Sequence, residues 1–188
     1  MTIILWIRHG EKEYSNGKNP NNIYQHDPGI IENTYDDIRL RGKYLIDTFG
    51  IPNIIYTSPF KRTRITATLL SEICPDVKIQ IEPQLGEFLG NQKPITSDIP
   101  DVETDTLKHL ETFLGEDFYD FKTRAINISK NLHYQSVRSK EKIIWIVTHS
   151  LIIKTISAHY RFKIDKPSIL SGVVFQYTNK KYPNVSLL

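Results

Sequence analysis

The side chains that could do chemistry gather in four short stretches of the sequence, each directly after a segment rich in β-branched and aromatic residues. The stretch "RHGEK" follows residues 3–7, "SPFKR" follows 53–57, "EPQLGEF" follows 77–81 and "HSL" follows 142–148. Together they supply Arg8, His9, Arg62, Glu87 and His149. Guanidinium and imidazole groups brought to one place repel one another unless an anion lies among them. The four stretches therefore predict a binding site for a dianion.

Phosphate is the dianion that these residue types suit best. Arginine presents a planar fork of N–H donors that matches two phosphate oxygens, and a helix that starts after Ser58 would add backbone N–H groups and a positive dipole. The imidazole of His9 could attack phosphorus if its other ring nitrogen is held by a partner. Gly10 would let the backbone turn tightly enough to present that imidazole. These residues predict phosphoryl transfer from a phosphate monoester.

Five short segments have the β-branched and aromatic content of buried strands, and two longer segments have helical character. The expected strands are 3–7, 53–57, 77–81, 142–148 and 172–177. One expected helix covers 59–73, with Ser58 as its N-cap and Pro59 at its first helical position. The other lies within 117–138, where apolar residues recur at intervals of four, three and four.

The alternation of strands and helices predicts an α/β fold. We expect a single three-layer α/β/α domain over residues 1–188, with a mostly parallel central sheet covered on both faces. In open sheets of this kind ligands bind beyond the carboxyl ends of the strands, where the four reactive stretches begin. Two long irregular stretches, 11–37 and 88–105, are expected to form the walls of that site.

Composition limits the class of protein further. The chain has 39% hydrophobic residues, 24% charged residues and a net charge of +3, which is ordinary for a globular domain. Its scattered Lys and Arg do not form the basic footprint of a nucleic-acid binder. No apolar run approaches the roughly 18 residues of a membrane span. Cys74 is the single cysteine, so no intrachain disulfide can form. We therefore expect a soluble, cytoplasmic protein that binds neither nucleic acid nor membranes.

Taken together, the motifs resemble those of the histidine phosphatase superfamily, the group that includes cofactor-dependent phosphoglycerate mutase. "RHGE" follows the first strand, "SPFKRTRITA" resembles the family's Ser-Pro-x-x-Arg-x-x-x-Thr-Ala pattern, "LGE" matches its Leu-x-Glu, and "THS" comes late, all in the family's order. The resemblance spans residue 3 to about 157. It implies a phosphoglycerate mutase-like fold and an enzyme that needs no metal or cofactor. Ser150 departs from the pattern, because many relatives have Gly there.

The resemblance also implies roles for the cationic and imidazole side chains. His9 would be the nucleophile that becomes phosphorylated. Arg8, Arg62 and His149 would bind the phosphoryl oxygens and stabilise the charge that develops in the transition state.

Three carboxylates compete for the role of general acid. By the same resemblance Glu87 would protonate the leaving oxygen and later activate water, and we rank it above Glu82 and Glu11 because it belongs to the Leu-x-Glu motif. Lys12 and Ser58 are expected to support substrate binding.

Other routes to phosphoryl transfer fit the sequence less well. A cysteine phosphatase needs Cys-x5-Arg, whereas Gln80 stands at that position after Cys74. A P-loop needs four residues between its first Gly and its Gly-Lys, but six separate Gly10 from the Gly-Lys that starts at Gly17. The histidines form no His-x3-His pair that would indicate zinc.

Hydrolysis by a phosphomonoesterase is favoured over mutase chemistry. A mutase must keep its phosphohistidine from water with added lids and tails, whereas the sequence ends about ten residues after the last expected strand. A phosphoglycerate mutase-type phosphotransferase and a non-catalytic phosphate-binding or interaction module remain alternatives. The expected partner is a phosphorylated small molecule or a phosphoprotein, and the sequence predicts neither the individual substrate nor the oligomeric state.

Overall fold

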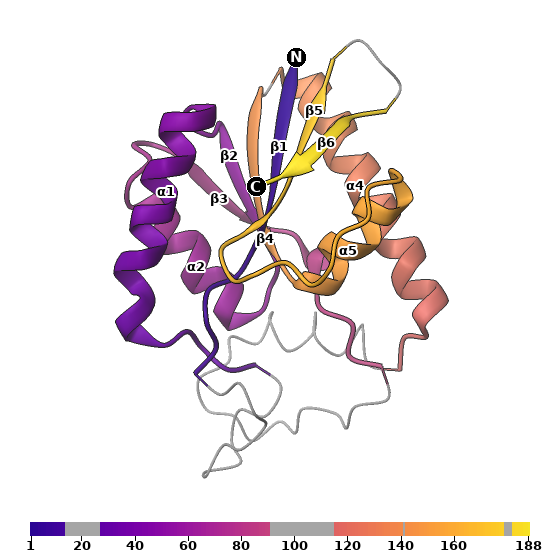
Figure 1. Cartoon of the computed structure of the whole chain (residues 1–188), viewed down its shortest axis with the longest axis horizontal. Coiled ribbons are helices and arrows are strands. Elements are labelled where there is room, and N and C mark those ends of the chain that lie inside the picture. Colours follow the sequence, from indigo (N-terminus) through magenta and orange to yellow (C-terminus); the bar gives the residue numbers. More distant parts are fainter. Residues whose placement is uncertain (14–26, 91–114, 141, 179–181) are drawn as a thin grey trace.

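The computed structural model describes residues 1–13, 27–90, 115–140, 142–178 and 182–188. Its elements run, in chain order, β1 (Thr2–Arg8), η1 (Glu32–Thr34), α1 (Tyr35–Phe49), β2 (Ile54–Thr57), α2 (Lys61–Ser71), β3 (Lys78–Ile81), η2 (Pro83–Leu85), α4 (Phe118–Ser139), β4 (Ile143–Thr148), α5 (Ser150–His159), β5 (Gly172–Tyr177) and β6 (Asn184–Leu187). The two η elements are short 3₁₀ helices. Figure 1 shows the helices on the two sides of one central sheet.

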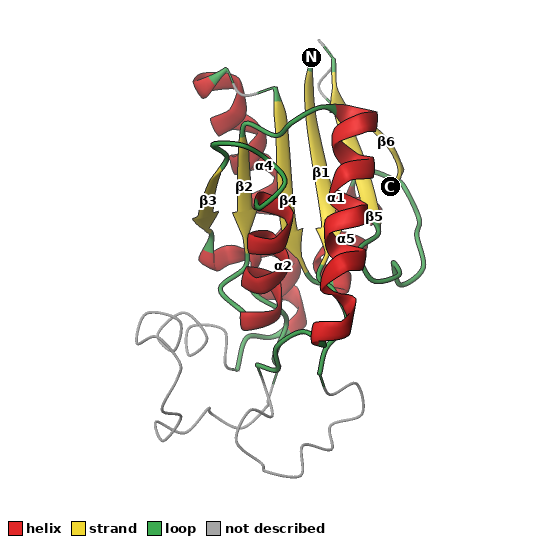
Figure 2. Cartoon of the chain, turned by 90° about the vertical axis from the view of Figure 1, so that its left-hand side faces the viewer, coloured by secondary structure: helices red, strands yellow, loops and turns green. Residues whose placement is uncertain are grey.

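Within the described residues the sheet has six strands in the order β3-β2-β4-β1-β5-β6. The first four in that order are mutually parallel, and β5 and β6 are antiparallel to their neighbours. Figure 2 shows the parallel strands pointing the same way. The carboxyl ends of β1, β2, β3 and β4 therefore meet at one edge, as the sequence analysis requires.

Two apolar cores, one on each face of the sheet, make the domain three-layered. Alternate β1 residues serve opposite faces: Ile4 and Trp6 pack with α4 and α5, whereas Leu5 and Ile7 pack with α1 and α2. Because both faces are covered, the central strands read as continuous apolar runs. The predicted α/β fold and its three layers are confirmed.

All five predicted strands are present, but among the α-helices and strands of the described residues three were not predicted. Strand β6 is short and mostly exposed, so it lacks a buried pattern. Helix α5 follows the apolar run of β4 with almost no break, which hides its helical period. Helix α1 carries Gly42 in its middle, a residue that disfavours helices in isolation. Gly42 is buried where α1 packs against Ile73 and Leu70 of the α2 region, and a larger residue would collide there.

The predicted boundaries hold for one helix and shift for the other. Helix α4 begins behind Asp117, whose carboxylate caps it, close to the expected limits. Helix α2 begins at Lys61, not at Pro59, and its N-cap is Phe60, not Ser58. The stretch 11–37 was expected to be irregular throughout, but its last residues form η1 and the first turn of α1. The segments 14–26 and 91–105 of the two expected walls lie outside the described residues.

No helix in the described part of the chain is long and apolar enough to span a lipid bilayer.

Candidate active site

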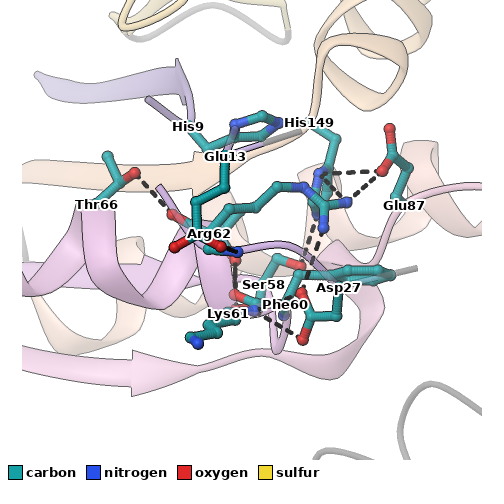
Figure 3. Close-up of polar contacts among 12 residues, drawn as sticks. His9, Glu13, Asp27, Ser58, Phe60, Lys61, Arg62, Thr66, Glu87 and His149 are labelled. Atoms are coloured by element: carbon teal, nitrogen blue, oxygen red, sulfur yellow. Dashed lines mark hydrogen bonds and ion pairs between the residues drawn. The ribbon is translucent and has the colours of Figure 1, made fainter. Parts of the chain in front are cut away.

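The predicted site residues come together at the carboxyl edge of the parallel strands. His9 follows β1, Arg62 lies in the first turn of α2 after β2, Glu87 follows η2 after β3, and His149 follows β4. Figure 3 shows Arg62 reaching between His149, Glu87 and a further carboxylate. We call Arg8, His9, Arg62, Glu87 and His149 the strand-end cluster.

The imidazole of His9 is held in one orientation. Its Nδ1 lies 2.7 Å from the carbonyl oxygen of Gly10, and a carbonyl can only accept, so Nδ1 carries the proton and Nε2 keeps its lone pair. The side chain is only 3% exposed. Burial, together with the positive charge of Arg62, lowers the pKa of His9 well below its usual value. His9 is therefore a neutral imidazole at pH 7, with the free lone pair that a nucleophile needs.

Gly10 contributes close packing instead of an unusual backbone angle. It is not among the glycines with positive φ, so the tight turn expected from its flexibility is not what requires a glycine here. A Cβ at this position would lie 3.0 Å from Cδ1 of Ile38 and 3.4 Å from Cγ2 of Ile30. The Gly10 N–H donates to Oγ1 of Thr66 at 3.0 Å, and the Thr66 hydroxyl donates to the Arg62 carbonyl at 2.7 Å. These bonds tie the end of β1 to α2.

His149 is completely buried between Ser58 and Arg62. Its Nδ1 lies 3.4 Å from Nη2 of Arg62, and its Nε2 lies 2.9 Å from Oγ of Ser58. A guanidinium can only donate, so Nδ1 accepts and Nε2 carries the proton that is donated to Ser58. Burial, followed by the charge of Arg62, lowers the pKa of His149 well below its usual value. Ser58, which was expected to cap α2, instead accepts from this second histidine, and its part in substrate binding stays a prediction.

Arg62 is the central cation of the site. Its side chain is 1% exposed, and its guanidinium lies over the ring of Phe60 with Cζ 4.4 Å from the ring centroid. Nη2 donates to Oε2 of Glu87, and Nη1 donates to Oδ1 of Asp27 at 3.3 Å. A guanidinium held between two carboxylates and an aromatic ring has a fixed direction, which favours bidentate recognition of an oxyanion.

Asp27 is a site residue that the sequence analysis missed. Its carboxylate accepts the backbone N–H of Lys61 at 2.8 and 3.0 Å, so it takes the position at the start of α2 that was assigned to Ser58 and to a bound phosphate. Burial raises the pKa of Asp27 to about 6, although Arg62 opposes the rise. The side chain comes from "QHDPG", which belongs to none of the motifs, so only its position in space reveals it.

Of the three carboxylates weighed as the acid, Glu87 is the one that contacts the other members of the cluster. Its Oε2 accepts from Arg62 and lies 3.8 Å from Nδ1 of His149. Burial alone would raise the pKa of Glu87, but the positive charges nearby, Arg62 first and Lys12 after it, outweigh burial and hold the pKa below its usual value. Glu82 is half-buried and accepts from the N–H of Gln84, and Glu11 is exposed.

Arg8 and Lys12 lie at the margin of the cluster. Arg8 donates from Nη1 to the Pro167 carbonyl at 2.7 Å, which anchors it to the segment before β5. Burial lowers the pKa of Arg8, and the charge of Glu87 opposes that change. Burial also lowers the pKa of Lys12, which is half-buried and feels the charges of Glu87, Arg62 and Arg8. Both cations are thus near enough to add to the positive potential around Arg62.

Two hydrogen-bond donors of the strand-end cluster have no acceptor among the described residues. The Nε–H groups of Arg8 and Arg62 are buried and make no hydrogen bond within the described chain. Leaving a buried donor unpaired costs about 1–3 kcal/mol, so such groups call for an acceptor. An oxyanion is the kind of ligand that meets this need. For metals, no three His, Cys, Asp or Glu side chains gather into a coordinating group in the part of the chain described.

The chain belongs to the histidine phosphatase superfamily (branch 1), whose family profile matches residues 4–170. An uncharacterized phosphoglycerate mutase family protein of Acanthamoeba polyphaga mimivirus is 29% identical over 160 residues, which cover 82% of this chain and 76% of that protein. The resemblance inferred from the motifs is therefore confirmed.

Solved structures of similar fold include both phosphatases and mutases. Phosphoserine phosphatase of Entamoeba histolytica, in complex with 3-phosphoglyceric acid, has a TM-score of 0.69 at 21% identity, with 100% of this chain and 96% of that chain covered. Phosphoglycerate mutase of Bacillus anthracis has a TM-score of 0.71 at 17% identity, with 100% and 92% covered. At these identities the likeness establishes a phosphoglycerate mutase-like fold.

Proposed function

We propose that this protein is a phosphomonoesterase that works through a phosphohistidine intermediate on His9. The observation that carries the proposal is the hydrogen bond between Nδ1 of His9 and the Gly10 carbonyl, which leaves the Nε2 lone pair of a neutral imidazole beside Arg62 and His149. Membership of the superfamily and the placement of four reactive residues at one sheet edge support it. The substrate is a phosphorylated small molecule or a phosphoprotein.

In the first step the phosphoryl dianion binds to the guanidinium groups of Arg8 and Arg62. Nε2 of His9 attacks phosphorus, forming a P–N bond while the bond from phosphorus to the leaving oxygen breaks. Glu87, in its protonated form, gives its proton to that oxygen, and the alcohol departs. The two guanidinium groups stabilise the charge on the equatorial oxygens, which is the largest contribution expected in phosphoryl transfer.

In the second step water attacks the phosphohistidine. Glu87, now a carboxylate, accepts a proton from the water as its oxygen bonds to phosphorus, and the P–N bond breaks. Inorganic phosphate leaves, His9 regains the lone pair on Nε2, and Glu87 holds the proton that it took from water. The sequence of steps needs no metal or cofactor to balance.

The ion pair between Arg62 and Glu87 must loosen for Glu87 to act as an acid. In this structure Arg62 favours the ionised form of Glu87. A bound dianion competes for Nη2 of Arg62 and adds negative charge beside the carboxylate, and both effects raise the pKa of Glu87. Substrate binding thus prepares the acid for the first step.

The proposal is tested by turnover of p-nitrophenyl phosphate in excess EDTA, with and without vanadate. We expect turnover that survives EDTA, is blocked by vanadate and is lost in His9→Ala. Equal rates for wild type and His9→Ala would refute the nucleophile and favour a non-catalytic module. A mutase would instead interconvert 2- and 3-phosphoglycerate faster than it releases phosphate, so the same enzyme is assayed on those two compounds.

A further inference from the structure

The segment that carries Glu87 is hydrogen-bonded to helix α4, which contributes no residue to the strand-end cluster. Arg124, in the second turn of α4, donates from Nη1 to two carbonyls of this segment, that of Gln84 at 2.7 Å and that of Gly86 at 2.9 Å. The second of these carbonyls belongs to the residue directly before Glu87. Because this guanidinium bridges two carbonyls so close to Glu87, it fixes the position of the backbone from which Glu87 projects.

Glu116 holds the guanidinium of Arg124 from its other side. Nε of Arg124 donates to Oε1 of Glu116 at 2.8 Å and Nη2 donates to Oε2 at 2.7 Å, which is a bidentate pair. Both side chains are 10% exposed, so solvent screens the pair little. Because the planar fork is fixed by Glu116, its remaining nitrogen points at the Glu87 segment with one geometry.

The rest of the segment is fixed as well. The Thr148 hydroxyl, at the end of β4, donates to the Leu85 carbonyl at 3.0 Å. On the other side of Glu87, the ring of Phe88 packs against Phe118 and Phe121 of α4, with centroid distances of 5.6 and 5.2 Å. Glu87 thus projects from a backbone held directly before it by Arg124 and directly after it by the α4 aromatic rings.

We propose that Arg124, oriented by Glu116, is a positioning residue for the general acid. The inference rests on the proposed phosphatase function, because it assigns Arg124 the task of setting the Glu87 carboxyl at the leaving oxygen. Displacing a reacting group by about 1 Å can cost about 100-fold in rate. The loss falls on the step in which Glu87 gives a proton, and spares a leaving group that departs without one.

The experiment compares Arg124→Lys and Arg124→Gln with wild type on two substrates, glycerol 2-phosphate and p-nitrophenyl phosphate. The quantity compared is kcat/KM, since it reports the first chemical step for both substrates. For Arg124→Lys we expect a loss of about 10- to 100-fold on glycerol 2-phosphate, and less than about 3-fold on p-nitrophenyl phosphate. The matched control is Arg138→Lys, in the last turn of the same helix, which should leave both values unchanged.

The lysine variant separates geometry from charge. It keeps the positive charge but cannot bridge two carbonyls while holding both oxygens of Glu116. If Arg124→Lys keeps the wild-type ratio of the two kcat/KM values, the proposal fails. Glu116→Gln offers a second route to the same result: it keeps the side-chain shape, weakens the bidentate pair and should shift the ratio in the same direction. Its ratio decides the matter should the arginine variants not fold.

A double-mutant cycle with Glu87→Gln tests whether Arg124 acts through Glu87. In the Glu87→Gln background, Arg124→Lys should lower kcat/KM on glycerol 2-phosphate little further. Additive losses in the cycle, or equal losses on both substrates, would overturn the positioning role. Failure of the proposed function gives a different result, because wild type and His9→Ala would then have the same activity on p-nitrophenyl phosphate.

Discussion

The guanidinium of Arg62 donates to the carboxylate of Glu87, so the central cation of the site and the proposed acid are partners of each other. Arg62 is also held by Asp27 and lies against His149. A phosphoryl group that binds to Arg62 must share or take over the nitrogen that Glu87 occupies. The ion pair therefore links anion binding to the protonation state of the acid.

Binding of a simple dianion should be accompanied by proton uptake. Sulfate stays fully ionised near pH 6, so any proton taken up comes to the protein. We expect isothermal titration calorimetry in two buffers of different ionisation enthalpy to show uptake by wild type at pH 6, and less by Glu87→Gln. Glu82→Gln, at a half-buried carboxylate that accepts from the N–H of Gln84, should behave as wild type. If Glu87→Gln takes up as many protons as wild type, the link between Arg62 and Glu87 is wrong.

Replacing the acid should affect substrates according to their leaving groups. For Glu87→Gln we expect kcat/KM on glycerol 2-phosphate to fall by about 100-fold or more, the range typical for a lost general acid. The loss on p-nitrophenyl phosphate should be below about 10-fold, because p-nitrophenolate departs without a proton. Steady-state kinetics on both substrates checks this, and equal losses would show that Glu87 is not the acid.

The covalent intermediate should be trapped on His9. A brief incubation with a ³²P-labelled phosphomonoester, followed by denaturation, should give a phosphoprotein that is labile in acid and stable in base. Phosphoramidates hydrolyse in acid, whereas phosphoserine survives it. The label should be absent from His9→Ala and present in Lys12→Ala, and acid-stable label would rule out a histidine nucleophile.

Asp27 should give the folded protein a distinctive pH dependence. Its pKa is raised from its usual 3.8 to about 6, so between these values the folded chain binds more protons than the unfolded chain. The contribution of Asp27 to the free energy of unfolding therefore falls as pH rises through this interval, by at most about 3 kcal/mol. Asp27→Asn has no carboxyl to titrate and so lacks this loss of stability. The histidines titrate alike in both proteins, so their contributions cancel when the two are compared. In urea unfolding, the free energy of unfolding of Asp27→Asn should rise relative to that of wild type from pH 4.5 to 7. A difference between the two that stays constant with pH contradicts the assignment.

The Thr66 hydroxyl should be needed for both stability and activity. Thr66→Val leaves the buried Gly10 N–H without its acceptor, which should lower the free energy of unfolding by about 1–3 kcal/mol. Because this bond positions the residue next to His9, activity on p-nitrophenyl phosphate should fall as well. Thr68→Val, on the exposed side of the same helix, should change the free energy by less than about 0.5 kcal/mol. Equal effects of the two substitutions would show that the Gly10 contact contributes nothing.

Sequence reasoning recovered the elements whose signal is local. The strands ending at Arg8, Thr57, Ile81 and Thr148 are enriched in β-branched and aromatic residues, and α4 has a regular apolar period. Elements without such a signal were missed. Helix α1 contains a glycine that is explained only by its contact with the α2 region, and β6 is paired but hardly buried.

The same division applies to the site. The sequence by itself determined that His9, Arg62, Glu87 and His149 meet, because parallel strands deliver the residues after their carboxyl ends to one edge. Only the tertiary structure determined which of these side chains form hydrogen bonds and ion pairs with each other. Asp27 accepts from Arg62, Ser58 contacts His149, and Arg124 donates to a carbonyl of the Glu87 segment. These contacts join residues far apart in the chain, and packing between elements, which no local pattern encodes, determines them.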